Sequence, residues 1–277
     1  MDTTELTPQE RRFESERIHA SPTVLLLAAI GLALYGVGKL LGSPAPGAGH
    51  SPVGSTLAFV GMAVLALAVV LHVDHLSYRI GRSAVVLMII GVILMGVGQL
   101  LGVLNASRIS VVWAIGSAFV VGGVGLAMVA VHKEGQMKAT LAEYAAGAPW
   151  QARVTVHASF LSLITGAAGL VLIGVAISGS TGDSGRTPSV LICVGGVLVV
   201  IGVISHVEHL VPRIGLAAVI AAILAPLMWA ANVIPTAMDP TDVEAYGTFG
   251  HWCVGVAGLL GALACALAFA KKLSTDR

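Results

Sequence analysis

Charged residues are scarce in this sequence. Only 10% of its 277 residues are Asp, Glu, Lys or Arg, and the 15 basic residues nearly balance the 14 acidic ones, which leaves a net charge of +1. A domain that binds nucleic acid carries a strongly basic face. This charge balance therefore gives no reason to expect nucleic acid as a partner.

Cysteine is also rare. The three cysteines show no C-x-x-C spacing, and all of them fall inside predicted helices, where a small apolar role is typical: Cys193, Cys253 and Cys265. No Ser-His-acid or Cys-His arrangement stands out, and no loop is long enough to form a separate catalytic domain. We therefore expect neither a disulfide scaffold nor an enzyme.

Apolar residues and glycine are abundant instead. The sequence is 56% hydrophobic, contains 34 glycines and has a mean hydropathy of +0.92, and its apolar residues cluster in long runs that lack the alternation of a β-barrel. Each run has about the ~20 residues that a helix needs to cross a membrane. The sequence predicts an all-α integral membrane protein with eight transmembrane helices, at residues 22–42, 55–75, 84–104, 109–131, 157–178, 189–209, 214–234 and 247–270.

Basic residues predict the orientation. With the N-terminus inside, twelve basic residues lie on the cytoplasmic side and three on the outer side, so both termini should be cytoplasmic, in a plasma membrane such as the bacterial inner membrane. Residues 1–21 are polar and show no cleavage pattern, and they predict an interfacial helix rather than a signal peptide. The outer residues are Lys39, Arg108 and Arg186.

The chain contains an internal repeat. The segment HVDHLSYRIG at residues 72–81 returns as HVEHLVPRIG at residues 206–215, with seven of ten residues identical. Gly31 and Gly169 correspond in the first helix of each copy, and Gly61 and Gly195 in the second. Matches in the fourth helices include Lys133 with Lys272.

The repeat predicts the domain organisation. Because four helices per copy is an even number, the two copies have the same orientation and are related by an axis along the membrane normal. We expect repeats at residues 22–133 and 157–272, an interfacial linker helix at 134–156 and a cytoplasmic tail at 273–277. Both motifs then lie at the cytoplasmic ends of equivalent helices.

The first functional hypothesis is a bound metal ion or haem-like cofactor. Imidazole is a common ligand of transition metals, and a nearby carboxylate can orient its second nitrogen. His19 and His157, which enter the first and fifth helices from the same side, could complete such a site. The candidate ligands of the motifs are His72, Asp74, His75, His206, Glu208 and His209.

The second hypothesis is transport of a cation or proton, because ionisable groups inside a membrane are costly and usually mark a pathway. The chain resembles the nickel/cobalt permeases in its eight spans and in a His/Asp-His motif in the second span. That family places its first histidine four residues before Asp-His, whereas only Val73 separates His72 from Asp74 here. We therefore carry over neither its function nor its site residues.

The third hypothesis is contact with lipid head groups or with a partner. Within a helix, His72, His75 and Arg79 share one face and Asp74 points elsewhere, and Arg82 follows nearby. The chain would then be a non-enzymatic accessory or scaffold subunit of a larger membrane complex, with the lipid bilayer and other membrane subunits as partners.

The second motif should differ from the first. Pro212 cannot continue a helix, because it lacks a backbone donor and clashes with the preceding turn. We expect the helix to kink or end there and Arg213 to be less securely placed.

Overall fold

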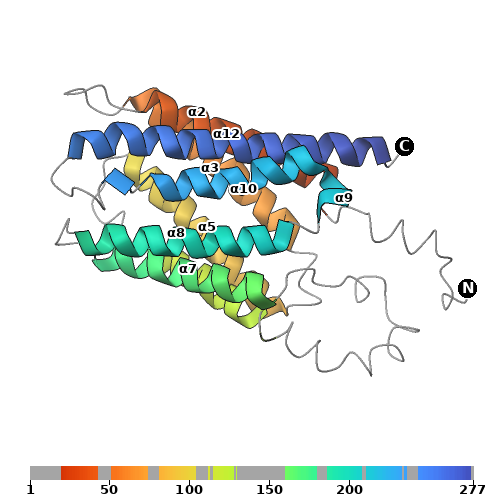
Figure 1. The fold of residues 1–277 in the computed structure, drawn as a ribbon, viewed down its shortest axis with the longest axis horizontal. Coiled ribbons are helices and arrows are strands. Elements are labelled where there is room, and N and C mark those ends of the chain that lie inside the picture. The colour runs from red at the N-terminus through yellow and green to blue at the C-terminus, as the bar shows by residue number, and fades with distance from the viewer. Residues whose placement is uncertain are drawn as a thin grey trace, which may run out of the picture.

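The described part of the chain consists of helices and short connections, and it contains no β-strand. The computed structural model describes residues 20–42, 51–73, 81–103, 112, 115–127, 129, 160–179, 186–207, 210–232, 234–235 and 243–275. Its helices are α2 (Pro22–Leu41), α3 (Pro52–Val73), α5 (Arg82–Val103), α7 (Phe160–Gly179), α8 (Arg186–Val207), α9 (Val211–Ile214), α10 (Leu216–Ala231) and α12 (Val243–Thr275), shown in Figure 1. One further apolar helix spans Ile115–Ala127.

Each of the eight predicted spans has a helix in the structure. Four helices are long and apolar enough to cross a membrane, Pro22–Leu41, Pro52–His72, Thr187–Ser205 and Gly247–Ser274, and four shorter apolar helices accompany them, Arg82–Gly98, Ile115–Ala127, Leu161–Ala176 and Leu216–Ala231. The largest difference is α12, which continues for 33 residues, well past the predicted range of residues 247–270. Hydropathy falls where lysine and polar residues begin, but no helix breaker interrupts the backbone there.

Helices α2 and α3 pack so closely that their backbones touch. A Cβ atom added at Gly31 would lie 2.7 Å from the Leu65 nitrogen, and one at Gly38 would lie 2.4 Å from the Ala58 nitrogen. Since residue 31 meets residue 65 and residue 38 meets residue 58, the two helices run antiparallel. Helices α7 and α8 approach in the same way, with a Cβ atom at Gly169 placed 2.4 Å from the Gly195 carbonyl oxygen.

Glycine also joins the first helix to the last. A Cβ atom at Gly36 of α2 would lie 2.7 Å from the Gly255 oxygen, and one at Gly258 of α12 would lie 2.8 Å from the Gly36 Cα atom. Since Gly255 also lies against Leu40 and Gly261 against Leu32, helix α12 runs antiparallel to α2. It also packs along α10 (Figure 1). As a result, the C-terminal ends of α3 and α12 lie at the end of the bundle where α2 begins. We call this the α2-start end.

The interior is filled by small side chains. Most buried apolar residues are alanine, for example Ala68 and Ala84, and none of the described residues is a large side chain with less than 2% exposure. Large aliphatic side chains such as Leu67, Val86 and Ile93 are about half exposed on the outer faces of their helices. The helices therefore contact one another through faces that carry small side chains, and the faces that carry large side chains point outward.

A paired substitution tests the close approach of α2 and α12. Gly36→Ala places a methyl group against the backbone of α12 and should lower the free energy of unfolding by about 1–3 kcal/mol, because neither backbone can yield cheaply. Gly96→Ala is the matched control: it meets nothing within 4 Å and should be neutral or stabilising, since alanine favours the helix. Thermal unfolding of the purified chain in detergent measures both. Equal stability of the two variants would contradict this packing.

Candidate functional site

The structure describes only part of the predicted site. His72 lies half-buried in the last turn of α3, and Arg82 is the exposed first residue of α5. His206 belongs to the end of α8, where only the backbone is described. The other predicted residues lie outside the described residues: His19, Asp74, His75, Arg79, His157, Glu208 and His209.

Both motifs end in a glycine that starts the next helix. Gly81 and Gly215 each have φ +87°, and the backbone of Gly215, with ψ 154°, lies in a region that is essentially restricted to glycine. The Val85 nitrogen donates to the Gly81 oxygen at 3.3 Å, and the Val219 nitrogen donates to the Gly215 oxygen at 3.2 Å. The glycine thus turns the chain and closes the first turn of α5 or α10.

The residues after each glycine anchor the new helix in the interior. Ala84 and Val85 have exposures of 0% and 4%, and Ala218 and Val219 have exposures of 1% and 3%. In the first copy, Ala84, Val85 and Ala127 form a buried cluster against which Val69 of α3 packs. The start of α5 therefore meets the end of α3, which places Arg82 at the α2-start end with His72. The final glycine of the motif has a structural role that residue type alone did not reveal.

The helix does not end at Pro212 as we expected: α8 ends five residues earlier, at the position where α3 ends in the first motif, which has no proline. Helix α8 ends at Val207, and Pro212 occupies the first turn of the four-residue helix α9, where a missing backbone donor costs little. Our expectation that Arg213 would be less securely placed is wrong, because its side chain is buried in α9 with 9% exposure. The proline starts a new helical turn instead of leaving the arginine in a loose segment.

Burial acts on the charge of Arg213. Desolvation lowers the pKa of its guanidinium group below the ordinary value of arginine. The ordinary value is so far above neutrality that arginine remains effectively always charged in proteins. The corner between α8 and α10 therefore holds a buried cation.

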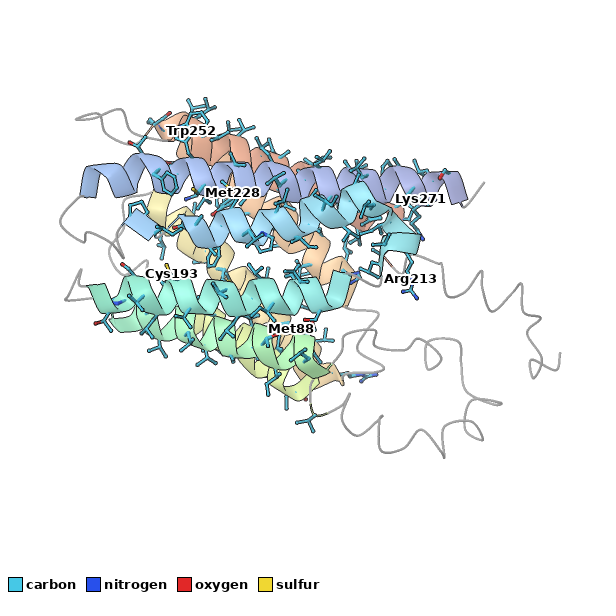
Figure 2. All side chains as sticks on the ribbon, viewed as in Figure 1. Met88, Cys193, Arg213, Met228, Trp252 and Lys271 are labelled. Carbon is cyan, nitrogen blue, oxygen red and sulfur yellow. The ribbon has the colours of Figure 1, made fainter. Side chains whose placement is uncertain are left out.

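A second buried cation lies at the same end of the bundle. Lys272, in the last turn of α12, has 7% exposure, and α9 packs against α12. Figure 2 labels Arg213 and Lys271, the residue that precedes Lys272. Both lie at the end of the molecule where α9 and the C-terminal turns of α12 meet. The sequence predicted only that Lys272 corresponds to Lys133 and lies on the cytoplasmic side. It could not predict the burial of Lys272, because burial depends on the neighbouring helices.

The described charges at this end are all positive, and they suit anions better than metal ions. They are Arg82, Arg213, Lys271 and Lys272. Among the described residues, no group of three or more His, Cys, Asp or Glu side chains could hold a metal ion. The hypothesis of a metal or haem site therefore depends on motif residues outside the described ranges.

The cysteines follow the expectation from sequence. Cys193, Cys253 and Cys265 are free and lie within α8 and α12. None of them takes part in a disulfide, and they are separated along long apolar helices. We assign them a packing role.

Substitution of the motif glycines tests the corners between helices. Gly215→Ala should lower the free energy of unfolding by about 1–3 kcal/mol, because a Cβ atom is strained at this φ and ψ, and Gly81→Ala should also be destabilising. Gly247→Ala provides the control, since a Cβ atom there meets nothing within 4 Å and its φ is not positive. Chemical or thermal unfolding in detergent reports the difference. If Gly215→Ala is as stable as Gly247→Ala, the proposed strain at the corner is absent.

Comparison with protein-family models, with curated proteins and with solved structures finds no match to this chain. Its function must be argued from its own residues.

Proposed function

We propose that this chain is an integral membrane protein with both termini on the cytoplasmic side. Its helices are apolar along their lengths, and four of them reach the length that a membrane span requires. Large aliphatic side chains face outward while small ones fill the contacts between helices. This arrangement suits a lipid surrounding, where close backbone packing rather than burial of bulky side chains associates the helices.

We also propose that the eight helices form two parallel four-helix repeats. Three structural correspondences between the copies support this arrangement. Gly31 meets Gly61 as Gly169 meets Gly195, and the corner glycines of the two copies share the same φ. The hydrogen bonds that close the first turns of α5 and α10 also join corresponding residues.

For a protein inserted in the membrane in this way, the function we favour is that of a non-enzymatic accessory or scaffold subunit. One observation carries this choice: four of the five buried polar side chains that the structure describes lie in the terminal turns or caps of helices. These four are Ser189, Arg213, Asn232 and Lys272, and the fifth is Ser117. A cation pathway needs polar groups near the middle of the membrane, whereas this distribution favours binding at the bundle ends.

Metal or cation binding by the motifs is the second candidate. The duplicated His-x-acid-His pattern favours it, and His72 lies at the α2-start end, where the two motifs would meet the aqueous phase. Imidazole and carboxylate groups from either copy could bind a metal there. The metal-binding and accessory-subunit hypotheses predict different amounts of bound metal in the purified protein.

Labelling of single cysteines tests membrane insertion and orientation. After Cys193, Cys253 and Cys265 are changed to alanine, Arg82→Cys and Lys271→Cys should react with a membrane-impermeant maleimide only from the cytoplasmic side. Trp252→Cys should react from the outer side, because Trp252 is 54% exposed near the other end of α12. Intact spheroplasts and inverted vesicles provide the two sides. Reaction of all three cysteines from one side would contradict the proposed insertion.

Elemental analysis and absorption spectroscopy separate the two functions. For an accessory subunit, we expect the chain purified from its native membrane to contain well below one metal ion per chain and no Soret band. His75→Ala and His209→Ala should then leave the size of the native complex unchanged, as should the control variant His50→Ala, which changes a histidine outside both motifs. Stoichiometric metal that is lost in the two motif variants and kept in His50→Ala would establish the metal site instead.

A further inference from the structure

Lys39 directs its charge back along its own helix. It lies in the last turn of α2, and its Nζ atom is 5.5 Å from the centre of the Tyr35 ring, one turn closer to the middle of the helix. A lysine near the end of a membrane helix ordinarily extends its ammonium group past that end to reach water. The ammonium group of Lys39 points the opposite way, toward the middle of the bundle.

Helical geometry places Lys39 and Tyr35 on the inward face of α2. Gly31 and Gly38 contact α3, and Gly36 contacts α12. At about 100° per residue, positions 35 and 39 fall between these two contact faces. The large exposed side chains of α2 form the opposite face: Leu26, Ile30, Val37 and Leu41. Lys39 and Tyr35 are both half-buried, so each keeps surface that a ligand can contact.

The described surroundings of this ammonium group offer it little negative charge. Gly61 of α3 lies against the Tyr35 backbone, and the adjacent inward residue, Met62, has only a weakly accepting thioether. No Asp or Glu is among the side chains that the structure describes. A cation over an aromatic ring gains about 0.5–2 kcal/mol, but the ring supplies no oxygen acceptor for the three N–H donors of an ammonium group. A ligand with negatively charged oxygens would supply both.

Apolar residues continue this inward face toward the cytoplasmic side. Leu32 and Ala28 follow Tyr35 at helical spacing on α2, and Met62 lies at the same level on α3. All three are half-buried. A small inorganic anion gains nothing from contact with such a surface, whereas an aliphatic chain is stabilised by it. The two kinds of surface together favour an anionic head with an aliphatic body.

We propose that Lys39 and Tyr35 form the head-group site for the carboxylate of an aliphatic acid that enters the bundle from the outer side. The Lys39 ammonium group donates to the carboxylate oxygens in charge-assisted hydrogen bonds. The Tyr35 ring holds the ammonium group in its inward position. The aliphatic chain lies along Leu32 and Met62.

The site belongs to the first copy of the repeat. Gly31 and Gly36 correspond to Gly169 and Gly174, which are 138 positions later, and the same offset takes Tyr35 to Ile173 and Lys39 to Ile177. Ile173 is buried, with 7% exposure. Isoleucine therefore replaces both groups in the second copy, and no equivalent head-group site exists there.

The test is a ligand titration of the full-length chain in a neutral detergent and a mildly alkaline buffer, followed by thermal unfolding. Dodecanoate should raise the unfolding temperature, because a ligand that binds only the folded state stabilises it. Dodecanol has the chain without the charge and acetate has the charge without the chain, so neither should stabilise the protein at equal concentration. Lys39→Gln should weaken the apparent affinity for dodecanoate about tenfold, as expected for loss of a hydrogen bond between charged groups.

Matched variants identify the source of any loss. Lys39→Arg keeps a cation and should retain most of the affinity, and Tyr35→Phe keeps the ring and should bind nearly as well as the original chain. Lys271→Gln removes a lysine from the exposed cytoplasmic end of α12 and should leave the affinity unchanged. Equal losses in Lys39→Gln and Lys271→Gln would show general attraction by charge and would overturn the proposal.

The comparison of ligands uses the original chain, so it remains decisive even if Lys39→Gln does not fold. The proposal is wrong if dodecanoate does not stabilise the chain. It is also wrong if dodecanol stabilises the chain equally, which indicates a purely apolar site, or if acetate does, which indicates a site for free anions.

This inference goes beyond the accessory function, and the two can fail separately. If dodecanoate has no effect, the head-group site is removed, while the labelling and metal measurements are unaffected. Stoichiometric metal bound by the motifs would overturn the accessory function without changing the binding of dodecanoate at Lys39.

Discussion

The fold depends on the close approach of helix backbones at glycine. Helix α2 provides two such faces: Gly31 and Gly38 meet α3, while Gly36 meets α12. In a lipid surrounding, apolar side chains gain little by leaving the solvent, so helix association depends on van der Waals contact at short range. A single methyl group at these positions would separate the backbones and remove that contact along the helix. The first helix is therefore the element to which both its sequence neighbour and the last helix of the chain are attached.

This packing also explains why the two halves of the molecule are similar but not equivalent. The contact between α2 and α12 is a backbone contact at Gly36. At Gly174 of α7, which corresponds to Gly36 in the repeat, an added Cβ atom would lie 3.8 Å from the Ser117 Cβ atom, with no backbone of the described residues within that distance. The second copy also contains Pro226 inside α10, whereas α5 of the first copy contains no proline. A site at the second corner is thus set in different surroundings from one at the first, even where the motif residues are identical. Two unequal sites are a more natural expectation than one symmetric site.

Much of the helical layout could be predicted from the sequence, because apolar runs of about the length of a membrane span determine where helices form. Helix ends were predicted less well, as α12 shows: hydropathy falls at Lys271, but the backbone continues to Thr275. The effect of Pro212 was predicted wrongly, because α8 ends at Val207, the position at which α3 ends at Val73 without a proline, and Pro212 lies within the next helical turn. The burial of Arg213 and Lys272 could not be predicted, since it depends on the packing of α9 against α12, and these two residues are 59 positions apart in the sequence.

The length of α12 connects these features. A helix of 33 residues is about 50 Å long at 1.5 Å per residue, which exceeds the ~30 Å hydrocarbon thickness of a membrane. Its glycine face holds α2 at Gly255 and Gly258, so the register of α12 in the bundle is fixed well before its C-terminal turns. Those turns carry Lys272 to the level of the corner at Gly215, which in the proposed insertion lies toward the head-group region. If the last helix were shorter, a cation at its end would lie inside the hydrocarbon. If the helix were packed more loosely, the depth of that cation would not be fixed. Glycine packing within the bundle therefore determines where the charge at its end can act.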